Sequence, residues 1–422
     1  MDQANEVVIT GLGVVSPIGV GKAAFWDALC SGRSGVRSWP SVQGTGMPVT
    51  FAAQVADFDA KAYVTPRKSL KVMCREIQMG FAAAVMALED AQLRKEQTDP
   101  DRFGVIYAAE MFYGELEELL DAYRNCMVDG QFQFSLWGTR LLTDIFPLWM
   151  LKYLPNMVAC HVGIAQDARG PNNSIVLGEA SSLLALSECA RVIERGHADV
   201  MIAGGTGSRL NVPAMLFRGD SNLSHRADEP ARASRPFDAD RDGMVNGEGA
   251  AVVILERAAH ARARGARPLA RVLGHGSSFE AVHPNRPRTG DGMRRAIRVA
   301  LASSQRNPHQ LDHVNAHGIS TRDDDRAEAE AIRDLLGEIR VTAPKSFFGN
   351  LGAGGGMVEL CASLAGLPHQ LVPHTLNYET PDPACPVEVI RDTPARLDQS
   401  TFLAVNQSGT GQAAAVVLEA LT

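Results

Sequence analysis

The sequence predicts an α/β fold made of two similar halves. In the first half, a short β-branched run at residues 174–176 leads into an apolar helical pattern from 178 to about 194. A buried-type strand at 198–205 follows, which completes the order of a βαβ unit. Beyond residue 257 the alternation of strand and helix patterns repeats, although no residue-level repeat is visible. We therefore expect residues 1–256 and 257–422 to form two α/β halves that pack as one unit.

The bulk composition is that of an ordinary globular protein. The 422-residue chain has 45% hydrophobic and 21% charged residues, and its net charge of -7 argues against nucleic acid as a partner. No apolar run approaches the ~20 residues of a membrane helix, and the start of the chain lacks the basic and apolar parts of a signal peptide. The seven cysteines contain no C-x-x-C pair. We expect a cytoplasmic protein in a reducing compartment, with no metal, no cofactor and no membrane contact.

The chain opens with a buried-type strand. It spans Val7 to Thr10, and we expect Gly11-Leu12-Gly13 to end it. These glycines do not continue as a dinucleotide motif, because Ser16 stands where the third glycine of G-x-G-x-x-G would fall. Helical spacing of apolar residues over 67–93 then predicts a packed helix, and 102–107 reads as a second strand.

The segment from about 110 to 150 is an insertion of unusual composition. It combines acidic helix-forming residues with several aromatic residues, namely Phe112, Tyr113, Phe132, Phe134, Trp137, Phe146 and Trp149. Aromatic residues among polar ones are typical of a partner interface. The alternative is an insertion that caps the core of the protein, and the sequence does not choose between the two.

The remaining elements follow the same alternation. We expect a loop rich in aspartate at 219–247, in which no glutamate closes a calcium-binding pattern. The other expected elements are strands at 250–256, 269–273, 314–316, 401–405 and 414–418 and helices at 293–304, 326–336 and 356–367.

Two positions in these elements favour chemistry. Glu179 lies where a strand turns sharply into a helix, a place where the helix N-terminus favours negative charge and where many enzymes hold a nucleophile. His317 ends a buried strand and precedes a glycine, and the ends of such strands border ligand crevices. A structural histidine bonded to the backbone is the alternative for His317. Lys345 precedes a glycine run rather than following it, so it does not belong to a phosphate loop.

Several longer motifs together make the chain resemble the β-ketoacyl synthases of fatty acid and type II polyketide synthesis. They lie in the order of that family over essentially the whole chain: Val8–Gly19, Leu154–Met157, Gly170–Asn172, Ser234–Asp238 through Asn246–Ala250, His317-Gly318 with Asp325 and Glu328, and Lys345-Ser346. The resemblance implies a thiolase-type five-layer αβαβα fold from two pseudo-repeated halves, and a dimer.

The resemblance also implies where the reacting groups would lie. The family's nucleophilic cysteine falls on Glu179, its two histidines fall on His317 and Asn350, and its supporting lysine and glutamate fall on Lys345 and Glu359. Asp325 belongs to the same supporting set, and the family's gate loop falls on Ser408-Gly409-Thr410-Gly411-Gln412, where Ser408 and Thr410 replace two phenylalanines. A carboxylate is a poor nucleophile toward a thioester, and an asparagine cannot act as acid or base. The resemblance therefore implies a copy that is inactive alone.

Such inactive copies resemble chain length factors, which pair with an active ketosynthase and shape its polyketide tunnel. In that interpretation the chain forms a heterodimer that serves an acyl carrier protein, and Phe112 and Tyr113 border the tunnel. Two alternatives remain. One is an active member of the fold, a malonyl-carrier decarboxylase or an acyltransferase that uses Glu179. The other is a homodimer that binds an acyl carrier. A Glu179→Gln change is expected to be silent in a non-catalytic subunit and damaging in an active one.

Overall fold

The first half is built on a five-stranded sheet. The computed structural model describes residues 5–110, 114–283 and 286–421. In spatial order the strands are β1 (Val7–Ser16), β10 (Glu248–Arg257), β9 (Val200–Ser208), β5 (Phe103–Ala108) and β8 (Asn172–Ile175). The first two pairings are antiparallel and the last two are parallel.

The second half repeats this topology. Its strands are β11 (Ala270–Phe279), β18 (Gln412–Ala420), β17 (Thr401–Gln407), β12 (Leu311–Asn315) and β13 (Arg340–Thr342), again with two antiparallel and then two parallel pairings. In both halves the chain visits the sheet positions in the same order. A short strand, β15 (Glu388–Val389), extends the second sheet, and β1 joins the two sheets by pairing with β11 over three residues. The predicted pair of similar halves is confirmed.

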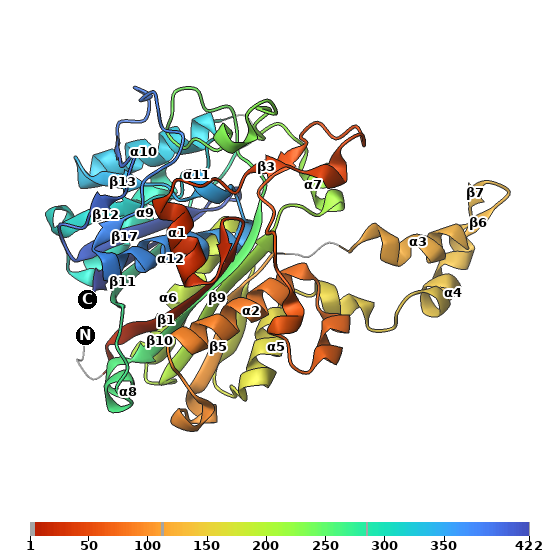
Figure 1. Ribbon diagram of the computed structural model, residues 1–422, viewed down its shortest axis with the longest axis horizontal. Helices are drawn as coiled ribbons and strands as arrows, with labels where there is room; N and C mark the ends of the chain where they lie inside the picture. The colour runs from red at the N-terminus through yellow and green to blue at the C-terminus, as the bar shows by residue number, and fades with distance from the viewer. Residues whose placement is uncertain (1–4, 111–113, 284–285, 422) are drawn as a thin grey trace.

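Helices cover and separate the two sheets. The outer face of the first sheet packs against α2 (Arg75–Asp90) and α5 (Met157–Gln166), and that of the second against α9 (Asp291–Ser304) and α10 (Arg322–Leu336) (Figure 1). Between the sheets lie α6 (Ser181–Glu194) and α12 (Gly355–Gly366), which contribute to a core cluster with residues of both halves. Every residue of α12 is buried, as its central position requires. This arrangement confirms the five-layer αβαβα fold.

Shorter elements complete the body of the protein. They are β2 (Gly19–Val20), α1 (Lys22–Cys30), β3 (Arg37–Ser38), β4 (Phe51–Ala52), α7 (Val212–Arg218), α8 (Ala258–Ala263), α11 (Lys345–Phe348), β14 (Leu371–Val372) and β16 (Ala395–Arg396).

The predicted end of the first strand is wrong. Strand β1 continues through Gly11 and Gly13 to Ser16. A Cβ atom on Gly11 would lie 2.5 Å from the carbonyl oxygen of Ala87, and one on Gly13 would lie 2.1 Å from that of Ala83. Both carbonyl oxygens belong to α2. The glycines therefore allow the helix to pack closely on the strand rather than ending it.

The helix predicted over 67–93 is shorter in the structure, and β8 lies at the edge of the sheet. Residues 67–72 form a 3₁₀ helix, and the α-helix occupies only Arg75–Asp90. Strand β8 is the outer strand of the sheet in the described structure, and its first two residues are exposed. This exposure follows from the edge position of β8, which pairs with β5 alone in the described chain.

The insertion forms an arm that projects from the body. It contains α3 (Leu116–Arg124), the hairpin strands β6 (Met127–Val128) and β7 (Gln131–Phe132), and α4 (Phe134–Asp144), and these elements extend to one side, away from both sheets (Figure 1). A small aromatic cluster holds the arm together, with the rings of Tyr123 and Trp137 4.6 Å apart between centroids. The alternative that the insertion caps the core is therefore wrong.

None of the helices in the described parts of the chain is long and apolar enough to span a membrane.

Candidate active site

A tight turn places Glu179 at the start of α6. Gly178 adopts a left-handed conformation with φ of +61°, and Glu179 follows within one turn of 3₁₀ helix, Gly178–Ala180, that leads into the helix. The Ser181 hydroxyl oxygen accepts a hydrogen bond from the backbone amide of Leu177 and so closes the turn. A Cβ atom on Gly178 would lie 3.2 Å from the Cβ of Ser408. The turn therefore sits directly against the β17–β18 connection.

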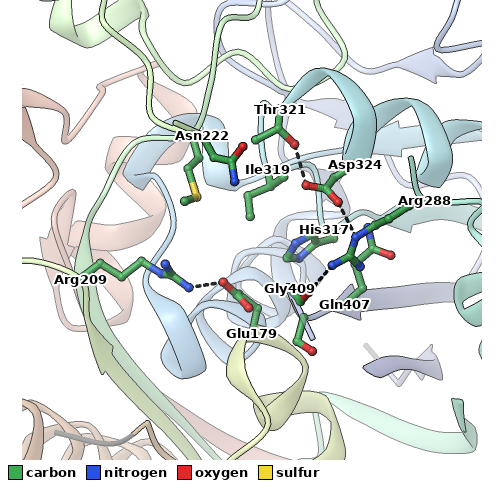
Figure 2. A pocket seen from close by; sticks show the side chains of 12 residues that line it. Glu179, Arg209, Asn222, Arg288, His317, Ile319, Thr321, Asp324, Gln407 and Gly409 are labelled. Carbon is green, nitrogen blue, oxygen red and sulfur yellow. Dashed lines mark hydrogen bonds and ion pairs between the residues drawn. The ribbon is translucent and has the colours of Figure 1, made fainter. Parts of the chain in front are cut away.

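The Glu179 carboxylate is buried, and one of its two oxygens accepts hydrogen bonds from two side chains. Its Oε1 accepts a short hydrogen bond from Nη2 of Arg209 (Figure 2). The same oxygen accepts a second hydrogen bond, of 3.1 Å, from Nδ2 of Asn350. Burial alone would raise the pKa of Glu179, but the adjacent Arg209, His317 and the Asn350 hydrogen bond together outweigh burial and lower that pKa to about 2. Glu179 is therefore a carboxylate at every physiological pH.

His317 is held by its backbone and by Lys345. It directly follows Ala316, the residue after β12, and its amide donates to Oε1 of Glu328 over 2.7 Å. The Lys345 ammonium lies 3.0 Å from Nδ1 of His317. An ammonium can only donate, so Nδ1 accepts and the neutral ring carries its proton on Nε2. Burial and the charge of Lys345 hold the pKa of His317 well below its ordinary value. His317 is thus a neutral hydrogen-bond donor toward the site.

Two further residues complete the group around Lys345. Oε1 of Glu359 lies 2.5 Å from the Lys345 ammonium, and Oε2 of Glu359 accepts from Nδ2 of Asn406 over 2.8 Å. Burial raises the pKa of Glu359, and Lys345 opposes that rise. The structure therefore brings Glu179, His317, Asn350, Lys345 and Glu359 together from four separate segments of the chain.

Asp325, which the sequence places among the supporting residues, binds the backbone near His317. Its carboxylate accepts hydrogen bonds from the backbone amides of Phe237, Ile319 and Ser320. These bonds fix the loop after His317 rather than the His317 ring. Burial raises the pKa of Asp325 to about 6, and burial raises that of the neighbouring Glu328 to about 8.

The Asn350 amide serves both sides of the site. Its Nδ2 donates to Glu179, and its Oδ1 accepts from the backbone amide of Gly352 over 3.0 Å. Neither atom can take up or release a proton near neutral pH. Asn350 therefore orients the Glu179 carboxylate without adding an acid or a base to the site.

Arg209 and its neighbours were not identified from the sequence as site residues. Arg209 is 8% exposed and lies just after β9. Its Nη2 is 3.9 Å from Oε1 of Glu110, whose Oε2 accepts from Nη2 of Arg218 over 2.9 Å. Four alternating charges thus run from the site toward the arm. A single arginine between a strand and a helix belongs to no motif, so only the folded chain reveals this partner of Glu179.

The side chains converge on a cavity of about 140 Å³. Its described lining includes Glu179, Arg209, Arg288, His317 and Ser408 and contains no cysteine. At its rim, Nε of Arg288 lies 2.8 Å from Oδ1 of Asp324, and Nη2 of Arg288 donates to the carbonyl oxygen of Gly409 over 2.7 Å (Figure 2). Arg288 therefore ties the β17–β18 connection to the start of α10.

The predicted gate positions form a polar turn. The hydroxyl oxygens of Ser408 and Thr410 are 2.8 Å apart, and Thr410 also contacts Oε1 of Gln412 over 2.9 Å. These contacts replace the packing that aromatic side chains would make here. The predicted tunnel residues Phe112 and Tyr113 lie outside the described residues.

The described cysteines supply no substitute nucleophile. Cys189 and Cys361 are buried in the central core cluster, and burial holds both thiol pKa values above their ordinary range. The geometry is thus that of a tight turn before a helix, which places a buried, ion-paired carboxylate at the wall of a small cavity.

Comparison with known proteins identifies the family. The chain matches the beta-ketoacyl synthase N-terminal domain over residues 4–261 and the C-terminal domain over residues 269–379. The protein belongs to the β-ketoacyl synthase family. A 3-oxoacyl-[acyl-carrier-protein] synthase 2 of Vibrio cholerae is 33% identical over 96% of this chain and 97% of its own.

Solved structures agree with this assignment. A type II polyketide synthase ketosynthase, described in complex with its acyl-carrier protein, has a TM-score of 0.85 and 30% identity and covers 99% of each chain. The ishigamide ketosynthase/chain length factor has a TM-score of 0.84 and 27% identity, again over 99% of each chain. The predicted resemblance to this family is confirmed.

Proposed function

We propose that this protein is a non-catalytic, chain-length-factor-like partner of an active β-ketoacyl-carrier-protein synthase. The observation that carries the proposal is the buried ion pair between Glu179 and Arg209 at the nucleophile's position. An ionised carboxylate with a pKa near 2 is weakly nucleophilic, and its adduct with an acyl group would be a labile mixed anhydride.

The size and charge of the cavity also oppose acyl transfer. About 140 Å³ is well below the roughly 300–1,000 Å³ of typical small-molecule pockets. Glu179 would repel the carboxylate of an incoming malonyl group. The second histidine of the family is Asn350, and the loss of one donor to a developing oxyanion typically costs about 100–1,000-fold in rate.

Two surfaces fit a protein partner. The arm exposes large apolar side chains, among them Phe134 at 77% and Leu142 at 85% exposure. In the described structure, strand β8 pairs with β5 alone, so its outer edge is open to another strand. Exposed apolar surface of this extent is typical of interaction sites. The similarity to a ketosynthase/chain length factor favours a Cys-bearing ketosynthase as the occupant.

Co-expression with such a ketosynthase tests the proposal. We expect the two chains to co-purify with equal stoichiometry, and we expect malonyl and acyl carriers to label only the partner's cysteine. A stable homodimer that ignores the ketosynthase but binds an acyl carrier would instead support the carrier-binding alternative. A covalent acyl group on this chain would contradict the proposal outright.

A second candidate is a malonyl-carrier decarboxylase. The observation in its favour is the intact group of His317, Lys345 and Glu359, which keeps a neutral histidine donor at the cavity. One such donor could still stabilise an enolate. Mass spectrometry of malonyl-carrier incubated with the purified chain separates the two functions, because only the decarboxylase would produce acetyl-carrier. A His317→Ala variant serves as the matched control.

A further inference from the structure

A line of alternating charges connects the inactive site to the root of the arm. Glu179 bonds to Arg209, Arg209 faces Glu110 at 3.9 Å, and Glu110 accepts from Arg218 over 2.9 Å. Glu110 comes two residues after the end of β5 and directly precedes the segment that leads into the arm. The side chains of Glu179, Arg209 and Glu110 are each at most 10% exposed.

A neighbouring contact fixes the same root from a second side. Asn211 caps α7 by accepting a hydrogen bond from the amide of Ala214, and its side chain also bonds the carboxylate of Glu115, which directly precedes α3. Arg218, at the other end of α7, holds Glu110. The N-terminal end of α7 therefore bonds to Glu115 and its C-terminal end to Glu110, both at the base of the arm.

The backbone at Gly352 makes room for this arrangement. Gly352 has a φ of +59°, and a Cβ atom there would lie 2.4 Å from Oε1 of Glu110. Its amide donates to Asn350, and Asn350 donates to Glu179. Glu110 thus lies close to the Asn350–Gly352 segment on one side and to Arg209 on the other, and both of these neighbours bond to Glu179, directly or through Asn350. A buried charge in such a group is costly if any one partner is removed, because it cannot recover its hydration.

We propose that Glu179 is a positioning residue for the arm: through Arg209 and Glu110 it holds the arm's root in one orientation. The carboxylate at the nucleophile's turn then has a structural task of its own. Since the arm projects from the body (Figure 1), its orientation depends on the contacts at its base. These include the contacts of Glu110 and Glu115 described above and the bonds of Glu118 to Lys152 and Tyr153. In a heterodimer as proposed above, on which only this last step rests, Glu179 would shape the surface offered to the ketosynthase.

Hydrogen–deuterium exchange of the full chain tests the proposal. In Glu179→Gln, residues 114–153 should exchange about threefold faster or more than in the unmodified protein, because the root loses a fixed partner. Arg218→Met, which removes the outer end of the line of charges, should have the same effect. If Glu179→Gln fails to fold, Glu179→Asp replaces it, since it keeps the charge and withdraws it from Arg209.

The matched control is Glu256→Gln. Glu256 is fully buried, pairs with Arg264 at 2.5 Å, and lies at the end of β10 remote from the site. We expect Glu256→Gln to destabilise the protein without altering exchange in the arm. Unchanged arm exchange in Glu179→Gln, or equal acceleration in Glu256→Gln, would overturn the inference. Because exchange is measured on the isolated chain, failure to bind a ketosynthase would count against the proposed function alone.

Discussion

The ion pair at Glu179 makes Glu179→Gln a stability experiment as well as a test of activity. The folded protein lowers the pKa of Glu179 from 4.5 to about 2. Each unit of pKa corresponds to about 1.36 kcal/mol, so the ionised form is favoured in the folded state by about 3 kcal/mol. The expectation of a silent substitution in a non-catalytic subunit therefore no longer holds, because Gln would leave the buried Arg209 with the more distant Glu110 as its anionic partner.

Thermal unfolding measures this loss. With an unfolding entropy of roughly 2.1 cal/mol/K per residue and 422 residues, a loss of about 3 kcal/mol lowers Tm by about 3–4 °C if the chain unfolds as one unit. The contribution has a defined pH dependence. Since the folded pKa lies below the unfolded one, it is fully present above pH 4.5 and disappears as the pH falls from 4.5 toward 2.

The comparison of Tm at two pH values is the decisive measurement. The difference between the unmodified protein and Glu179→Gln should be constant from pH 6 to pH 8 and should shrink below pH 4.5. A double variant, Glu179→Gln with Arg209→Met, should recover much of the loss, because it removes both buried charges together. Equal Tm values at pH 7, or a double variant less stable than either single one, would refute the reasoning.

Three further predictions test other parts of the site. The double variant Glu179→Cys with Asn350→His should be acylated by an acyl carrier more than tenfold faster than Glu179→Cys alone, because the second histidine supplies the missing oxyanion donor. Mass spectrometry of the labelled chain measures the two rates, and equal rates would contradict this. Arg288→Ala should free the Gly409 carbonyl and speed cleavage of the β17–β18 turn in limited proteolysis by several-fold. Phe134→Asp on the arm should leave Tm within about 1 °C and reduce recovery of a co-expressed ketosynthase; unchanged recovery would exclude this part of the arm from the interface.

The fold could be predicted from the sequence because the pattern is regular. The order of strands and helices recurs in both halves, so their similar topology follows without any residue-level repeat. The error at the end of the first strand has a physical cause. Considered locally, Gly11 and Gly13 indicate the end of a strand. In the structure they lie inside β1, because α2 packs so closely against β1 that only glycine fits at these positions. Such contacts between distant segments leave no local signal.

Only part of the candidate site could be predicted, again because contacts between distant segments leave no local signal. Glu179, His317 and Asn350 stand in motifs whose spacing is visible in the chain, and the structure brings their side chains around one cavity or its wall. Arg209 has no such motif, because its role arises only once β9 carries it against Glu179. The sequence also could not show that the arm projects from the body, because an amphipathic helix has the same pattern whether it covers its own core or a partner.

Glu179 and Asn350 also depend on each other physically. A carboxylate buried at residue 179 needs a counter-ion and a neutral donor, and Arg209 and Asn350 supply one each. A positively charged histidine at residue 350 would compete with Arg209 for the same oxygen, whereas the asparagine amide adds a hydrogen bond without adding charge. Glu179, Asn350 and Arg209 thus form one electrostatic unit, and its balance of charge explains how an ionised carboxylate remains buried at residue 179.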